Sequence, residues 1–258
     1  NTCKLFSTIL PEGLKLPASG LVKINIDGIS PFKLKTNQTS YITRQLFWND
    51  PMAFEYTPIF KELVKKVGTF WDVGANIGYY SVLGCQANPN LKIRAFEPSE
   101  GAKTYLQANV ELNKLSNRVV VEPLALSNFK GEIEFHQIVN PKFPNIANLS
   151  GEHNIGTKKN LPSKKVRVKT LRMDDYASDI DSIDLMKIDT EGAEVEILKG
   201  GLETIKEHQP IIICETLFNK NETEIEDIGK QKDKDNDDIK DDIKDDNNED
   251  KDEDEVID

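Results

Sequence analysis

The stretch FWDVGANIGYYS, residues 70–81, decides the fold. An apolar run reaches Asp72, a turn containing Gly74 and Gly78 follows, and a helical pattern then begins. A strand, a tight glycine turn and a helix in this order are typical of a nucleotide-binding loop, where the backbone must approach its ligand closely. The sequence therefore predicts an α/β fold whose first loop holds a nucleotide-like cofactor.

Strands and helices alternate on both sides of this stretch. We expect strands at residues 69–73, 91–97, 118–124, 182–189 and 210–216, and helices at 77–87, 101–115 and 191–200. Two further β segments, 132–139 and 164–170, interrupt the alternation as an insert, and residues 21–36 alternate about Asp27-Gly28 as a β-hairpin. Strands that are apolar on both faces indicate a doubly wound, mostly parallel sheet covered by helices.

The charge of the chain is divided unevenly. Residues 220–258 carry 19 acidic and 7 basic side chains, whereas the other 219 residues carry 25 acidic and 26 basic ones. The net charge of -11 therefore belongs to the tail, and no basic face for nucleic acid is expected. The sequence from 231 to 258 has almost no apolar residues to offset ordering entropy, so we expect it to be disordered. We divide the chain into an irregular segment with a hairpin (1–50), an α/β domain (51–230) and an acidic tail (231–258).

Metal sites and membrane spans are not expected. Asp233, Asp235 and Asp237 have the first spacings of a calcium-binding loop, but Lys244 stands where that loop needs glutamate. No apolar run approaches the roughly 20 residues that cross a bilayer. Three cysteines at spacings that suit neither zinc nor disulfides favour a reducing compartment. The chain begins at Asn1 rather than methionine, so removal or omission of an upstream targeting segment, and with it secretion, is left open. The expected location is cytoplasmic, and the oligomeric state is left open.

The glycine loop discriminates between cofactors. A dinucleotide site requires G-x-G-x-x-G, but Asn76 and Tyr79 occupy the second and third glycine positions counted from Gly74. An Asp at position 72 suits a ligand that carries an ammonium and a sulfonium better than one with two phosphates. Glu97 closes the next strand, where an acid accepts hydrogen bonds from both ribose hydroxyls. These residues favour a nucleoside cofactor over a dinucleotide.

At this point the chain resembles the FkbM-type S-adenosylmethionine-dependent methyltransferases, over roughly residues 40 to 218. The resemblance rests on FWDVGANIGYYS, AFEPS, ALSN and MKIDTEGAEVEILKGG. It implies a class I methyltransferase (Rossmann-like) fold, S-adenosylmethionine as cofactor and an oxygen as methyl acceptor. By position it implies cofactor contacts from Asp72, Gly74, Ala75, Asn76, Gly78, Glu97, Ala125 and Leu126. In this family a helix and an antiparallel strand pair follow PIIICET; here an acidic repeat follows, so the domain is expected to lack that last pair.

Carboxylates are the candidate catalytic groups. Asp189 follows a central strand and could take the proton of the acceptor, or it could instead cap the next helix; Glu191 could share either role. Glu215 could line the acceptor pocket or lie in water at the sheet edge. His136, on a strand of the insert, could reach the cleft, and His153 lies in the long loop of the insert, where a lid over the substrate could form; a surface role is favoured for each.

The expected function is transfer of a methyl group from S-adenosylmethionine to a hydroxyl of a sugar or small metabolite, with a small-molecule or glycan acceptor. One alternative is a catalytically impaired or truncated methyltransferase-fold protein that acts as a binding module. A nicotinamide-dependent oxidoreductase on a similar sheet is the other alternative, against which the missing glycines count.

Overall fold

The computed structural model describes residues 10–11, 14–149, 162–177, 182–215 and 225–228. Its centre is a five-stranded sheet in which every pairing is parallel and the strand order is β10-β9-β3-β4-β5. These strands are β3 (Thr69–Val73), β4 (Lys92–Phe96), β5 (Val119–Glu122), β9 (Leu185–Ile188) and β10 (Ile211–Cys214). The predicted parallel α/β sheet is confirmed.

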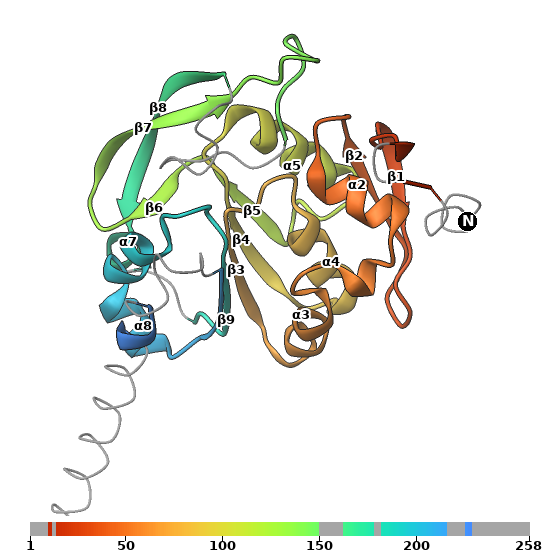
Figure 1. The fold of residues 1–258 in the computed structure, drawn as a ribbon. Helices are drawn as coiled ribbons and strands as arrows, with labels where there is room; N and C mark the ends of the chain where they lie inside the picture. Colours follow the sequence, from red (N-terminus) through yellow and green to blue (C-terminus); the bar gives the residue numbers. More distant parts are fainter. Residues whose placement is uncertain (1–9, 12–13, 150–161, 178–181, 216–224, 229–258) are drawn as a thin grey trace, which may run out of the picture.

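Helices cover both faces of this sheet, as Figure 1 shows. The face toward the N-terminal hairpin carries α3 (Thr57–Leu63), η3 (Val64–Lys66), α4 (Tyr79–Ala87) and α5 (Glu100–Leu112). The opposite face carries α6 (Met173–Ala177), α7 (Glu194–Lys199) and α8 (Leu202–His208). Two more short helices, α2 (Tyr41–Trp48) and η2 (Pro51–Ala53), lead from the hairpin into the domain. The sheet is therefore doubly wound.

Two smaller sheets flank the central one. The predicted hairpin is formed by β1 (Gly20–Ile24) and β2 (Phe32–Thr36), paired antiparallel from Gly20↔Thr36 to Ile24↔Phe32. The insert is a three-stranded sheet of order β6-β8-β7, built from β6 (Ala125–Ser127), β7 (Gly131–Ile138) and β8 (Ser163–Arg172). The two β segments expected for the insert are β7 and β8, which run antiparallel to each other, and β6 adds a parallel edge.

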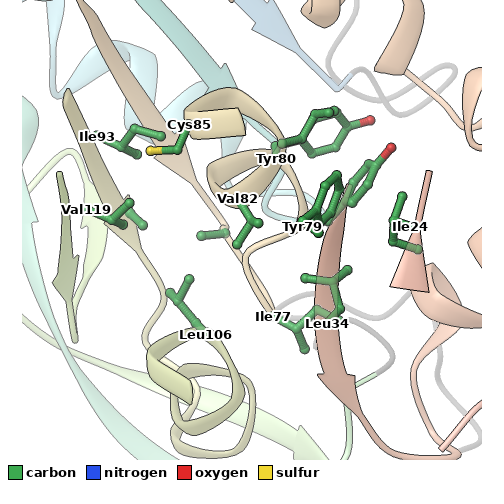
Figure 2. Close-up of a cluster of buried hydrophobic side chains, with 14 of the residues drawn as sticks. Ile24, Leu34, Ile77, Tyr79, Tyr80, Val82, Cys85, Ile93, Leu106 and Val119 are labelled. Atoms are coloured by element: carbon green, nitrogen blue, oxygen red, sulfur yellow. The ribbon is translucent and has the colours of Figure 1, made fainter. Parts of the chain in front are cut away.

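The hairpin shares the core of the α/β domain. Ile24 and Leu34 of the hairpin lie in the same buried cluster as Tyr79 of α4 and Leu106 of α5 (Figure 2). Asn109 of α5, which is fully buried, joins the parts: it accepts a hydrogen bond from Lys35 N and donates to Lys35 O (3.1 Å) and Ile77 O (2.8 Å). The predicted domain boundary at residue 50 stays a prediction.

Several short elements were not predicted, namely α2, β6, α6 and α8. Each has ten residues or fewer, so the apolar periodicity that marks a long element is absent. The start of α2 does carry a local signal, because Ser40 accepts a hydrogen bond from Thr43 N (3.2 Å) as an N-cap. The acidic tail and the residues where the last strand pair is expected to be missing lie outside the described residues, apart from 225–228, which are helical.

Candidate functional site

A cavity of about 760 Å³ opens at the carboxyl ends of the central strands. Its walls are the loop after β3, the segments that follow β4, β5, β9 and β10, and residues of β7. Residues 41–42, 55–56 and 148–149 close it from the N-terminal side. That wall is held together by Thr39 Oγ1, which accepts from Leu149 N (2.8 Å), and by Asn37 Nδ2, which donates to Ala147 O (2.9 Å). A ligand site is expected at this end of a parallel sheet, and the volume is within the usual range of about 300–1,000 Å³.

The glycine loop lies in close contact with the backbone at the end of β9. Gly74, Asn76 and Gly78 all have left-handed backbones, with φ of 78°, 49° and 84°. A Cβ on Gly74 would lie 2.0 Å from Asp189 O, so only glycine fits there. The N–H groups of Gly74 and Ala75 both donate to Phe96 O at 3.0 Å, which ties the loop to β4. Gly74, Ala75 and Asn76 line the cavity as predicted candidates, whereas Gly78 begins α4 behind it.

Glu97 holds the other side of this loop. Its Oε2 accepts from Asn76 N (2.8 Å) and its Oε1 from Ser99 N (2.9 Å), and the residue is 6% exposed at the cavity wall. Burial raises the pKa of Glu97 to about 7 although both hydrogen bonds favour the charged form. A carboxylate has about four lone-pair sites, so two remain for ligand hydroxyls. The role of Glu97 in ribose binding stays a prediction.

Asp72 is placed differently from the expectation. Side chains alternate along β3, and Asp72, like Phe70, faces α4, where Ser81 Oγ donates to its Oδ2 (2.6 Å). It is 1% exposed and is not among the residues that line the cavity. Burial raises its pKa against the attraction of Lys187 and the hydrogen bond from Ser81. Asp72 therefore supports the loop from behind rather than facing the cavity.

Asp189 lies in the cavity wall but does not cap the next helix. The N-cap of α7 is Ala193, which makes no side-chain cap hydrogen bond. The turn before α7 is instead closed by Glu194 Oε1, which accepts from Thr190 N (2.9 Å) and Gly192 N (3.1 Å). The cap interpretation of Asp189 is therefore wrong. Glu191 also lines the cavity, with a left-handed backbone (φ 58°).

Lys187 forms an ion pair with Asp189 inside the protein. Its side chain is 3% exposed, and Nζ lies 2.6 Å from Asp189 Oδ2 and 5.0 Å from the centre of the Tyr80 ring. Burial disfavours the charge of Lys187, but attraction by Asp189 and Asp72 raises its pKa. Burial likewise opposes the charge of Asp189, yet the attraction and hydrogen bond of Lys187 lower its pKa below the usual 3.8. The pair is therefore ionised at neutral pH.

Two other carboxyls face the same space. Glu215 follows β10, and burial, then the charge of Asp189, raises its pKa to about 8. Glu55 lies between η2 and α3 with φ 36°, and burial, followed by Asp189, raises its pKa to about 7. The sequence had placed Glu215 only as one of two possibilities and had missed Glu55 and Lys187. Lys187 could have been recognised from the sequence, since it is a charged residue inside the otherwise apolar strand LMKI. Glu55 could not, because its segment reaches the site only through tertiary packing.

The remaining candidates divide between the cavity and its surroundings. Ala125 and Leu126 line the cavity as predicted. His136 lies on β7 outside the cavity lining, 3.5 Å from Glu134 Oε1 and 3.4 Å from Ser163 Oγ. His153 lies outside the described residues. Within the described ranges no group of three or more His, Cys, Asp or Glu side chains is placed to hold a metal ion, and no helix has the length and apolar character of a bilayer span.

Comparison with known proteins gives consistent matches. The sequence pattern of the "Methyltransferase FkbM domain" matches residues 72–243. Methyltransferase sdnD of Sordaria araneosa is 27% identical over 201 residues, which cover 69% of this chain and 74% of that protein. The 2-O-methyltransferase NoeI of Sinorhizobium fredii is 31% identical over 144 residues (52% and 57%), and the hexuronic acid methyltransferase AglP of Haloferax volcanii 26% over 145 residues (55% and 54%).

The matched region therefore spans about three quarters of the first relative and little more than half of the other two. Among solved structures, methyltransferase FkbM from Methylobacillus flagellatus KT aligns with a TM-score of 0.41 at 18% identity, covering 57% of this chain and 32% of that one.

Proposed function

Since this chain belongs to the FkbM methyltransferase family, we propose that it transfers the methyl group of S-adenosylmethionine to a hydroxyl oxygen of a sugar or small metabolite. The main support for this proposal is the arrangement of the cavity wall. The glycine loop and Glu97 lie together on one side of the cavity, and Asp189 lies on another. The relatives named as a 2-O-methyltransferase and a hexuronic acid methyltransferase support an oxygen acceptor and a sugar.

The residues present fit S-adenosylmethionine. Glu97 has lone pairs left for the ribose hydroxyls, and the absence of a side chain at Gly74 lets the loop lie close to both β9 and a ligand. The charged side chains of the cavity wall are acidic except for Lys187, which is paired with Asp189. Such a wall suits a ligand with an ammonium and a sulfonium, and it offers no free cation for a pyrophosphate within the described residues. We therefore assign the cofactor to Gly74, Ala75, Asn76, Glu97, Ala125 and Leu126.

S-adenosylmethionine supplies a methyl group that is already activated on a sulfonium. The work of this chain is then to hold the acceptor oxygen in line with that methyl and to accept its proton. Positioning of two reactants can supply roughly 7–11 kcal/mol of the barrier, and a placed base contributes about 10²–10⁴-fold. Asp189, Glu191 and Glu215 line the cavity, and we assign these carboxyls to the side that receives the acceptor. Tyr56, whose N–H donates to Tyr80 Oη (3.1 Å), fixes the segment opposite them.

Two measurements test this function. Calorimetry with S-adenosylmethionine and with S-adenosylhomocysteine should give saturable binding at one site, because both share the ribose and the amino acid portion. Transfer of a labelled methyl to a panel of neutral sugars, uronic acids and small alcohols should then show turnover with at least one acceptor. Binding without any turnover across the panel would favour the alternative of a methyltransferase-fold binding module, and no binding would refute the proposal.

A further inference from the structure

Asp189 and Glu215 are side-by-side neighbours on parallel strands. The β9–β10 register runs from Leu185↔Ile211 to Ile188↔Cys214, and Glu215 N donates to Ile188 O (2.9 Å), which continues the pairing by one residue. Residues in register on adjacent strands point to the same face of a sheet. The two carboxyls therefore project together from the carboxyl end of the sheet, and both line the cavity.

The two carboxyls have different partners. Lys187 Nζ lies 2.6 Å from Asp189 Oδ2, and no corresponding cation is paired with Glu215 among the described residues. Glu215 Oε2 is buried and, within the same part of the chain, has no hydrogen-bond partner. The other groups that act on Glu215 are acidic: Glu191 in the turn after β9 and Glu194 at the start of α7. Asp189 is thus the member that carries a negative charge, and Glu215 the member that keeps a proton.

Further neighbouring groups, which also surround Asp189 and Glu215, are likewise acidic or neutral. Glu55 and Tyr56, from the segment between η2 and α3, face Asp189, and Tyr56 also faces Glu215. Cys214 precedes Glu215, and burial, followed by the neighbouring carboxylates, raises the pKa of its thiol to about 12, so it stays neutral. Burial, then the charge of Asp189, raises the pKa of Glu215 to about 8. Two like charges this close do not both ionise readily, so the pair titrates as a unit.

A base is most effective when its pKa lies near the working pH. Asp189, held ionised by Lys187, has little tendency to bind a proton, whereas Glu215 binds one strongly once it is ionised. Resting on the proposed function, we propose that Glu215 is the base that takes the proton of the acceptor hydroxyl, and that the Asp189–Lys187 ion pair is its positioning partner. This assigns a catalytic role to a residue for which the sequence had predicted only a place in the acceptor pocket or in water at the sheet edge.

The step balances as a methyl transfer. The O–H bond of the acceptor breaks and its proton moves to a carboxylate oxygen of Glu215. The freed oxygen electron pair forms the new bond to the methyl carbon, and the electron pair of the broken carbon–sulfur bond stays on sulfur. Glu215 then releases the proton to water. The step needs no further co-reactant.

The test uses the full chain and three variants. Glu215→Gln removes the base and keeps its size; Asp189→Asn removes the neighbouring charge; Glu203→Gln, on the exposed side of α8, makes the same chemical change far from the cavity and serves as control. Single-turnover methylation is measured from pH 6 to 9 with the acceptor identified by the panel. Carboxyl ¹³C NMR titration of the same proteins without cofactor measures the ionisation of Asp189 and Glu215 independently of turnover.

We expect the wild-type rate and that of Glu203→Gln to rise with pH through an inflection near 8. Glu215→Gln should lose this inflection and fall by about 10²–10⁴-fold. Asp189→Asn should lower turnover less than Glu215→Gln does, because the base remains but its positioning partner is lost, and it should move the inflection to lower pH, because the charge that opposed ionisation of Glu215 is gone. In the NMR titration, a carboxyl with a midpoint near 8 should disappear in Glu215→Gln and move down in Asp189→Asn.

Two results would overturn this inference while leaving the proposed function intact: full activity of Glu215→Gln in a protein whose wild type methylates its acceptor, or a Glu215 carboxyl that titrates like an exposed glutamate. A wild-type protein that binds cofactor and methylates nothing refutes the proposed function, and the inference falls with it.

Discussion

Replacement of Gly74 by alanine should lower the free energy of unfolding by more than the cost of its left-handed backbone alone. Gly74 and Gly20 have similar left-handed backbones, with φ of 78° and 86°. A Cβ on Gly20 would meet nothing within 4 Å, whereas a Cβ on Gly74 would lie 2.0 Å from Asp189 O. The left-handed backbone costs about 1–2 kcal/mol at either position. Gly20→Ala therefore measures that cost by itself.

The additional cost at Gly74 comes from moving backbone. Ordinary van der Waals contact begins near 3.4 Å, so the loop and the end of β9 must separate by more than ~1 Å. Overpacking of this kind adds about 1–3 kcal/mol. We expect about 2–5 kcal/mol for Gly74→Ala against about 1–2 kcal/mol for Gly20→Ala, and each kcal/mol lowers the Tm of a domain of this size by about 2–4 °C.

Two assays separate the effects. Denaturant unfolding of both variants gives the stability difference, and calorimetry with S-adenosylmethionine gives the effect on the loop. Gly20→Ala should bind the cofactor as the wild type does, and Gly74→Ala should bind it at least about tenfold more weakly, which corresponds to 1.4 kcal/mol. Equal stability losses together with unchanged affinity in Gly74→Ala would show that the close approach of the loop to Asp189 is not as described.

Three further predictions follow from other contacts. Glu97→Gln should weaken S-adenosylmethionine binding by about 10–100-fold with the fold retained, since an amide cannot accept from both Asn76 N and Ser99 N as a carboxylate does; an unchanged calorimetric Kd would contradict this. The cofactor-free protein should lose stability as pH rises from about 4.5 to 8, because Glu55, Glu97 and Glu215 keep protons in the folded state that the unfolded chain has released; urea unfolding at pH 5 and pH 8 should give the larger free energy at pH 5. Asn109→Ala should cost about 2–3 kcal/mol by leaving buried backbone groups unpaired, whereas Asn113→Ala, which removes the same kind of pairing with Lys33 nearer the surface, should cost less than about 1 kcal/mol in the same unfolding assay.

Much of the fold could be predicted because its central elements carry strong local signals. The strand at 69–73 is mostly apolar, ends in a glycine turn and is followed by a helical pattern, so its type and its place in a parallel sheet could be predicted. The strands at 92–96 and 185–188 each carry charged residues as well, but their apolar residues between helical segments were enough to predict the alternation that the structure confirms. Short elements such as α6 and α8 lack such signals, and tertiary packing of Met173 and Ile205 rather than propensity determines them.

The candidate site was predictable in part for a related reason. Residues at strand ends can be placed from the sequence, because parallel strands bring their carboxyl ends to one edge; Glu97, Asp189 and Glu215 all lie there. The direction of a side chain near a strand end depends on its position in the alternation between the two faces of the sheet. Asp72 accordingly faces α4 instead of the cavity. Partners contributed by distant segments, such as Glu55, cannot be found without the packing itself.

The strand order β10-β9-β3-β4-β5 has a consequence for synthesis of the protein. The edge of β3 that finally pairs with β9 must wait for residues 185–188, which leave the ribosome 112 residues after Val73. At about 5–20 residues per second this interval lasts roughly 6–22 s. During it, the nascent chain presents an unpaired edge of β3, whose sequence, TFWDV, includes the large apolar residues Phe70, Trp71 and Val73. A chaperone that recognises short apolar segments would find its target there, and slower translation between residues 73 and 185 would extend the period in which misfolding competes with completion of the sheet.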